Sequence, residues 1–84
     1  MTEQITVLIA DDFPNNLMIF KLMLEDLKYN VITANNGDEA VKMAISQQPD
    51  LIILNYGMPK KDGLEAFIEI RKHPAIGKTP ILVD

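Results

Sequence analysis

Three polar residues stand where buried strands are predicted to end, and they are the residues best placed to do chemistry. Asp11 and Asp12 directly follow the apolar run 5–10, and Asn55 is the first polar residue after the apolar run 51–54. Ligands of open α/β sheets bind beyond the carboxyl ends of the strands, so these side chains are expected to face a site. Adjacent carboxylates at such a place need water, a cation or hydrogen-bond donors. Alternatively, one of them caps the following helix while the other is solvated.

The elements that must position these residues alternate regularly between strand and helix. Short apolar or β-branched runs indicate strands, and longer segments with a period near 3.6 residues indicate helices. The predicted strands span residues 5–10, 31–34, 51–54 and 79–83, and the predicted helices span residues 14–28, 38–48 and 64–73. Such alternation predicts an α/β fold, with right-handed crossovers and a parallel sheet covered by helices on both faces.

Each predicted helix has an apolar face that should contact the sheet or a neighbouring helix. In the first helix the broad apolar arc consists of Leu17, Ile19, Phe20, Met23, Leu24 and Leu27. Met18 and Leu22 form a second patch, which predicts another neighbour for this helix. The second helix has Ala40, Val41, Ala44 and Ile45, and in the third Leu64, Phe67, Ile68 and Arg71 share a face, beside Ala66 and Ile70.

The composition of the chain argues against several classes of function and location. With 84 residues, 24% of them charged, the chain is expected to form one domain over residues 1–84. A net charge of −4 argues against nucleic-acid binding, and the absence of cysteine excludes disulfides and thiolate chemistry. The apolar runs are too short to cross a membrane, and residues 1–4 do not resemble a signal peptide, so a cytoplasmic location is expected. His73 is expected to have a structural role in the last turn of the third helix.

Taken together, these residues resemble the receiver domain of bacterial two-component response regulators, along the whole chain. The signature is an apolar strand ending in Asp11-Asp12, then an apolar strand running into Met58-Pro59 and Asp62-Gly63. The resemblance implies a flavodoxin-like, doubly wound sheet with strand order 2-1-3-4 for the four predicted strands. In that order the first and third strands are neighbours, so Asp11, Asp12 and residue 55 should meet.

The resemblance also implies a chemistry for this site. In the family, the residue matching Asn55 is an aspartate that accepts a phosphoryl group from a histidine kinase or phosphotransfer protein. Mg²⁺ is held there by that aspartate, the acidic pair and the backbone carbonyl that corresponds to Gly57. The implied function is that of a receiver module in a phosphorelay, a signalling protein rather than an enzyme.

Asn55 departs from this pattern in one decisive way. An amide cannot form an acyl phosphate, so phosphorylation at this position is excluded. The side chain can still offer one oxygen to Mg²⁺, with weaker binding because one formal charge is missing.

The second departure is that the 84 residues match only the first four strands and three helices of a five-stranded receiver. Counting from Pro80, the family's Ser or Thr would fall one residue beyond Asp84. The output face and the helix that packs beside the first helix are therefore expected to be missing. A truncated receiver of this kind would leave apolar surfaces bare, which predicts a homo-oligomer.

The sequence argues against two other functions and leaves a third open. A Mg²⁺-dependent phosphatase of the haloacid dehalogenase type needs Asp-x-Asp, and Phe13 occupies the third position here. A nucleotide-binding protein would need a Gly-rich phosphate loop, which the sequence lacks. A structural assembly unit with a vestigial acidic pocket is the remaining alternative.

Overall fold

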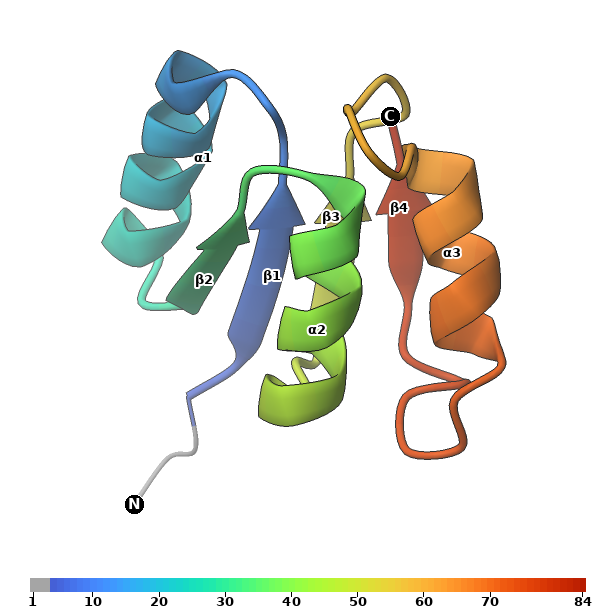
Figure 1. The fold of residues 1–84 in the computed structure, drawn as a ribbon. Helices are drawn as coiled ribbons and strands as arrows, with labels where there is room; N and C mark the ends of the chain where they lie inside the picture. The colour runs from blue at the N-terminus through green and yellow to red at the C-terminus, as the bar shows by residue number, and fades with distance from the viewer. Residues whose placement is uncertain (1–3) are drawn as a thin grey trace.

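The computed structural model describes residues 4–84 as alternating strands and helices (Figure 1). Residues 1–3, which carry most of the segment compared with a signal peptide, lie outside the described residues. The elements are β1 (Thr6–Ala10), α1 (Pro14–Asp26), β2 (Asn30–Ala34), α2 (Gly37–Gln47), β3 (Leu51–Leu54), α3 (Gly63–Arg71) and β4 (Ile81–Val83). The predicted element order is confirmed.

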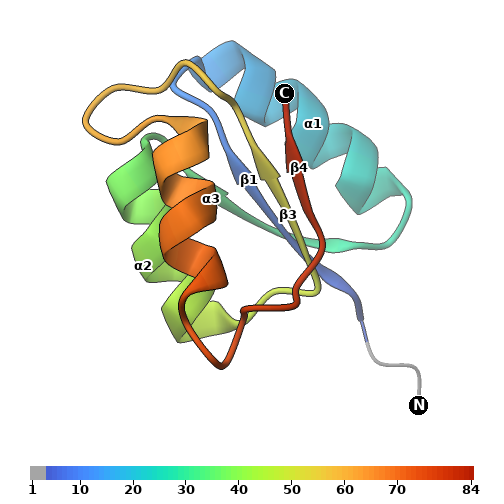
Figure 2. The ribbon, with the colours of Figure 1, turned by 90° about the vertical axis from the view of Figure 1, so that its right-hand side faces the viewer.

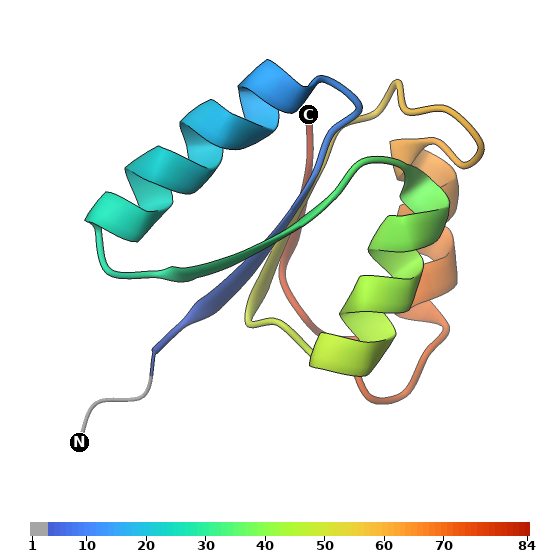
Figure 3. The same ribbon diagram turned by 60° about the vertical axis from the view of Figure 1, so that its left-hand side comes forward.

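The four strands form one parallel sheet in the order β2-β1-β3-β4, which confirms the predicted fold class. Helix α1 lies on one face of the sheet, and α2 and α3 lie together on the other (Figures 2 and 3). In the register of the sheet, Ala10 of β1 is paired with Leu54 of β3 and with Ala34 of β2. The residues that follow Ala10 and Leu54 therefore emerge side by side at the carboxyl edge.

The main core fills the space between the sheet and helices α2 and α3. Its largest fully buried side chains are Leu8, Ile52, Leu54, Ile70 and Ile76. At roughly 2–5 kcal/mol for each Leu or Ile truncated to Ala, this layer contributes much of the stability of a small domain. It also anchors the loop after β3, because Met58 is only 5% exposed and belongs to the same cluster.

The inward face predicted for α3 is only partly confirmed: Phe67 packs against the main core, but Leu64 and Ile68 do not. Gly63, Ala66 and Ile70 are buried, whereas Leu64 and Ile68 are 48% and 46% exposed. The reason is close backbone packing at the start of the helix, where a Cβ on Gly63 would lie 2.7 Å from the Asn55 carbonyl oxygen. This contact turns the line of small residues toward the sheet and the larger Leu64 and Ile68 outward.

The end of α3 also differs from the prediction. The helix ends at Arg71, so His73 lies in the following turn, where its backbone N–H donates to the Ile70 carbonyl. Pro74 explains this ending, because a proline disfavours helical geometry in the residue before it. The Arg71 guanidinium then holds the turn by donating to the carbonyls of Gly77 (3.0 Å) and Thr79 (2.6 Å).

Helix α1 is much less buried than its apolar arc predicted. Only Leu17 and Leu24 of this helix pack against the second cluster, which contains Val7, Ile9 and Val31 of the sheet. No residue of α1 is buried. Among the described residues, α1 contacts β1 and β2 but neither β3 nor β4. Two strands of the sheet are therefore without a helix on this face.

Within residues 4–84, the helices are all too short or too polar to cross a bilayer.

Candidate functional site

The candidate site lies at the carboxyl edge of β1 and β3, where backbone hydrogen bonds extend the sheet by one residue. The Asp11 N–H donates to the Ala34 carbonyl (3.1 Å), and the Asn55 N–H donates to the Ala10 carbonyl (2.9 Å). These bonds fix the Cα positions of Asp11 and Asn55 on adjacent strands. The side chains are thus placed by the sheet rather than by a mobile loop.

The structure brings Asp11, Asp12 and Asn55 together. The Asn55 amide nitrogen Nδ2 donates to Asp11 Oδ1 and to Asp12 Oδ1, each at 3.2 Å. Asp11 is buried at 7% exposure, while Asp12 and Asn55 are half-buried. Asn55 therefore forms one hydrogen-bonded cluster with two adjacent aspartates that lie more than 40 positions before it in the sequence.

Asp11 is held by two further donors on the chain that follows it. Its Oδ1 accepts from the Phe13 backbone N–H (3.0 Å), and its Oδ2 accepts from Asn16 Nδ2 (3.3 Å). Hydrogen bonds of this kind make a buried carboxylate tolerable. The alternative that one carboxylate caps α1 is not what the structure has, because the N-cap residue is Phe13 and no side chain caps the helix.

Asn16 is a site residue that the sequence interpretation missed. It lies in the first turn of α1, which begins at Pro14, and its amide turns back toward β1. The available signal was its position: a residue in the first helical turn, five residues after an aspartate at a strand end, can reach that aspartate. Asn16 thus links the start of α1 to the acidic pair.

Gly57 lies in the exposed turn that follows β3, two residues beyond Asn55. The turn is fixed on both sides, because the Tyr56 N–H donates to the Asp84 carbonyl (2.9 Å) and the Gly63 N–H donates to the Tyr56 carbonyl (2.8 Å). Within the described part of the chain, no protein hydrogen bond uses the Gly57 carbonyl. That oxygen keeps its capacity to accept or to bind a cation.

Asp62, which belongs to the signature identified in the sequence, begins α3 as its N-cap. Its carboxylate accepts from the Glu65 backbone N–H (2.8 Å), and the Glu65 carboxylate accepts from the Asp62 N–H (3.2 Å). This capping box satisfies two backbone donors that a helix start otherwise leaves open. Asp62 is therefore committed to the helix rather than to the acidic pair.

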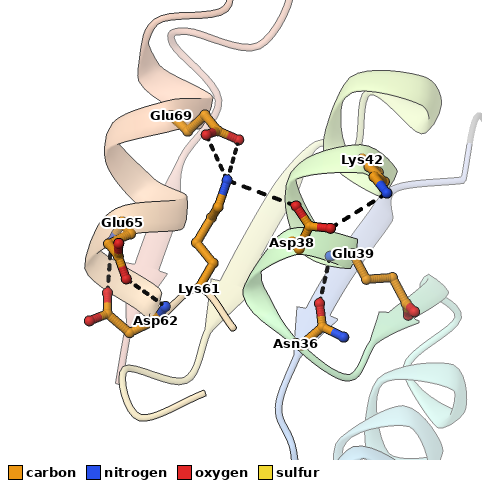
Figure 4. A network of polar contacts seen from close by, with 8 residues as sticks. All are labelled: Asn36, Asp38, Glu39, Lys42, Lys61, Asp62, Glu65 and Glu69. Atoms are coloured by element: carbon orange, nitrogen blue, oxygen red, sulfur yellow. Dashed lines mark hydrogen bonds and ion pairs between the residues drawn. The ribbon is translucent and has the colours of Figure 1, made fainter. Parts of the chain in front are cut away.

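Lys61 joins the loop after β3 to both α2 and α3 (Figure 4). Its Nζ donates to the two oxygens of Glu69 at 2.6 and 2.7 Å and lies 3.9 Å from Asp38 Oδ1. The hydrogen bond to Glu69 raises the pKa of Lys61 above its ordinary value, and the nearby charges of Glu69 and Asp38 act in the same direction against partial desolvation. The sequence interpretation did not identify this lysine, because its partners come from two separate helices.

The donor set at the cluster fits a small, hard cation. Two carboxylates converge on the single Asn55 nitrogen, and amide and carbonyl oxygens are the other ligands that Mg²⁺ accepts. Among residues 4–84, no group of three or more His, Cys, Asp or Glu side chains is placed so that it could hold a metal ion, so the acidic ligands here are limited to the pair.

Comparison with known proteins shows which family this chain is similar to. The model of the response regulator receiver domain matches residues 7–83. The chain is 39% identical over 66 residues to the alkaline phosphatase synthesis transcriptional regulatory protein PhoP of Bacillus subtilis, covering 79% of this chain and 28% of that protein. It is 36% identical over 72 residues to the sensor protein EvgS of Escherichia coli K12, covering 86% of this chain and 6% of EvgS.

Solved structures agree with this family. The N-terminal domain of a response regulator receiver protein from Methanoculleus marisnigri JR1 has a TM-score of 0.89 and 36% identity, with coverage of 93% of this chain and 63% of that one. The receiver domain of sensor histidine kinase PA1611 from Pseudomonas aeruginosa, described with magnesium coordinated in its active-site cleft, has a TM-score of 0.92 and 31% identity, with coverage of 96% and 66%. The chain thus spans about two thirds of these structures and less than a third of the two curated relatives.

Proposed function

The chain belongs to the response regulator receiver family, and from that premise we propose that it is a receiver module which cannot be phosphorylated at residue 55 and acts through protein contacts. The observation that carries this proposal is the position of Asn55, at the end of β3 and hydrogen-bonded to both members of the acidic pair. A phosphoacceptor must attack phosphorus with a carboxylate oxygen. A neutral amide offers no such nucleophile.

The residues that would hold Mg²⁺ are Asp11 and Asp12 through their carboxylates, Asn55 through its amide oxygen and Gly57 through its backbone carbonyl. When bound, the cation would offset the negative charge of a phosphoryl group beside the acidic pair. Affinity should be low, because the site supplies two formal negative charges where the family supplies three. The magnesium reported for the PA1611 receiver domain supports this location.

The partner class we propose is a histidine kinase or a phosphotransfer protein in the cytoplasm. Support comes from the relatives, which include a sensor protein and the receiver domain of a sensor histidine kinase. A chain that occupies such a partner without accepting phosphate would compete with receivers that do accept it.

Exposure of the chain to a small phosphodonor tests this function against a phosphatase-like one. With acetyl phosphate and Mg²⁺, the intact mass of the protein should stay unchanged, and a chromogenic aryl phosphate should not be hydrolysed. A phosphatase that uses the acidic pair would turn over the aryl phosphate and form a covalent intermediate on an aspartate. Turnover or a stoichiometric mass gain would therefore contradict the proposal.

Self-association is the second part of the proposal, and the surface of α1 carries it. We define the outer α1 face as Met18, Ile19, Leu22 and Met23, each between 56% and 61% exposed. Leu82 of β4 is 60% exposed, and strand alternation puts it on the sheet face opposite Ile81, which packs against the main core. The four residues of the outer α1 face form an exposed apolar patch on successive turns of one helix, and patches of this kind often mark a contact site. In the 84-residue chain, a second copy would cover it.

Sedimentation equilibrium of the 84-residue chain should give a dimer or larger oligomer, and Leu22→Lys should shift it to monomer. Leu22 is largely exposed, so the substitution should cost the fold itself less than about 0.5 kcal/mol. The matched control is Gln47→Lys, which adds the same charge at an exposed position on α2 and should leave the oligomer intact. A monomeric parent chain, or equal effects of the two variants, would rule out this surface.

A further inference from the structure

The acidic pair presents an electrostatic problem that the fold solves without a metal ion. Asp11 and Asp12 are adjacent, and Asp11 is only 7% exposed, so their charges repel one another in a partly desolvated place. Such a pair needs a compensating group. The cation that would supply it in the proposed function is bound weakly at best, so another group of the chain must serve.

We propose that the Asn55 amide group takes the place of the cation, so that its N–H donors hold the acidic pair together and make the folded pocket independent of metal. This inference rests on the proposed function, because it concerns the residue at the phosphoacceptor position. Asn55 would then stabilise the pocket, in addition to lacking the nucleophilic oxygen of an aspartate.

The distances around Asn55 support a role for its amide in place of a cation. One Asn55 nitrogen lies 3.2 Å from an oxygen of each aspartate, and a primary amide has two hydrogens, one for each carboxylate. The opposite amide orientation would place a carbonyl oxygen against two carboxylates and add to their repulsion. The two aspartates therefore determine which way the amide points.

The remaining contacts of Asp11 add further donors from the chain itself. Its two oxygens accept from Phe13 N–H, Asn16 Nδ2 and Asn55 Nδ2. For Asn55 to bind Mg²⁺ through oxygen, the amide must turn over and release both aspartates. Cation binding in this chain is thus weakened in two ways. It must break these hydrogen bonds, and the site has fewer negative charges than the family's.

An aspartate at residue 55 would reverse the balance between metal-free and metal-bound stability. It has nearly the same shape, but it would bring a third acceptor to the place where two carboxylates now meet a donor. Without a cation the three groups repel one another, and with Mg²⁺ they become a strong ligand set. The same substitution should therefore make the stability of the fold depend on metal.

Thermal unfolding in EDTA and in millimolar Mg²⁺ tests the inference on the parent chain, Asn55→Asp, Asn55→Ala and the control Gln47→Glu. In EDTA, Asn55→Asp and Asn55→Ala should both melt below the parent chain, and Gln47→Glu should melt close to it. Added Mg²⁺ should raise the Tm of Asn55→Asp by on the order of 5–10 °C and that of the parent chain by much less. Asn55→Ala should gain little, because it restores neither donor nor charge.

Two outcomes would overturn the inference: Asn55→Ala as stable as the parent chain in EDTA, or equal Mg²⁺ stabilisation of the parent chain and Asn55→Asp. If Asn55→Asp does not fold in either buffer, Asn55→Ala alone decides, because it removes the donor without adding a charge. The result of this unfolding experiment can be distinguished from the result of the phosphodonor experiment that tests the proposed function. Phosphoryl transfer depends on the nucleophile at residue 55, whereas this experiment measures metal-free stability.

Discussion

Asn55→Asp is expected to convert a chain that gains no phosphate into one that is labelled by acetyl phosphate in the presence of Mg²⁺. The new carboxylate oxygen would attack phosphorus, forming an acyl phosphate as the bond from phosphorus to the acetate oxygen breaks and acetate leaves with the electron pair. The position is suitable, because Asn55 is fixed by the sheet and its side chain already meets both aspartates. Intact mass measurement should show a gain of one phosphoryl group, absent from the parent chain.

Two further variants make this result specific. Gln47→Glu makes the same change from amide to carboxylate at an exposed position on α2 and should remain unlabelled. Adding Asp11→Asn to Asn55→Asp should sharply reduce labelling, since it removes one of the two carboxylates proposed to hold Mg²⁺. Peptide mapping that places the phosphate on a residue other than 55, or labelling of Gln47→Glu to the same extent, would contradict the assignment.

Gly37→Ala is expected to destabilise the chain severely, although alanine is intrinsically the better helix former. A Cβ at Gly37 would overlap the Lys61 carbonyl oxygen and lie 2.6 Å from the carbonyl carbon, which are backbone atoms that cannot rotate away. Helix propensity favours alanine by about 1 kcal/mol. Relieving the clash requires the α2 start and the loop after β3 to separate, at an expected cost above about 3 kcal/mol. The net loss should exceed about 2 kcal/mol, which lowers Tm by at least about 8 °C.

Gly57→Ala is the matched control for this measurement. Gly57 lies in the loop after β3, which also carries Lys61, but no atom comes within 4 Å of its missing Cβ and its φ is not positive. Urea or thermal unfolding should therefore find Gly57→Ala close to the parent chain. If Gly37→Ala is as stable as Gly57→Ala, the contact between α2 and Lys61 does not hold the loop that carries Gly57.

The sequence by itself determined the elements and the residues at their ends. Apolar runs followed by Asp11-Asp12 and by Asn55 located two strand ends, because a strand interior excludes polar side chains over a few consecutive residues. Regular alternation predicted the parallel α/β sheet. The strand order followed from the resemblance to receivers, and it predicted that the three polar residues meet.

Only the tertiary structure decided which apolar faces are buried and which way the Asn55 amide points. Helical periodicity identifies residues that share a face, but whether that face is covered depends on neighbouring elements. Thus Ile19 and Met23 of α1 are exposed, and on α3 the small residue Ala66 faces inward in place of Leu64. The Asn55 amide orientation depends on two carboxylates that the fold alone brings to it across the sheet, and one of them, Asp11, also accepts from Asn16. Sequence periodicity is a local property, whereas burial and electrostatic pairing arise between segments distant in the chain.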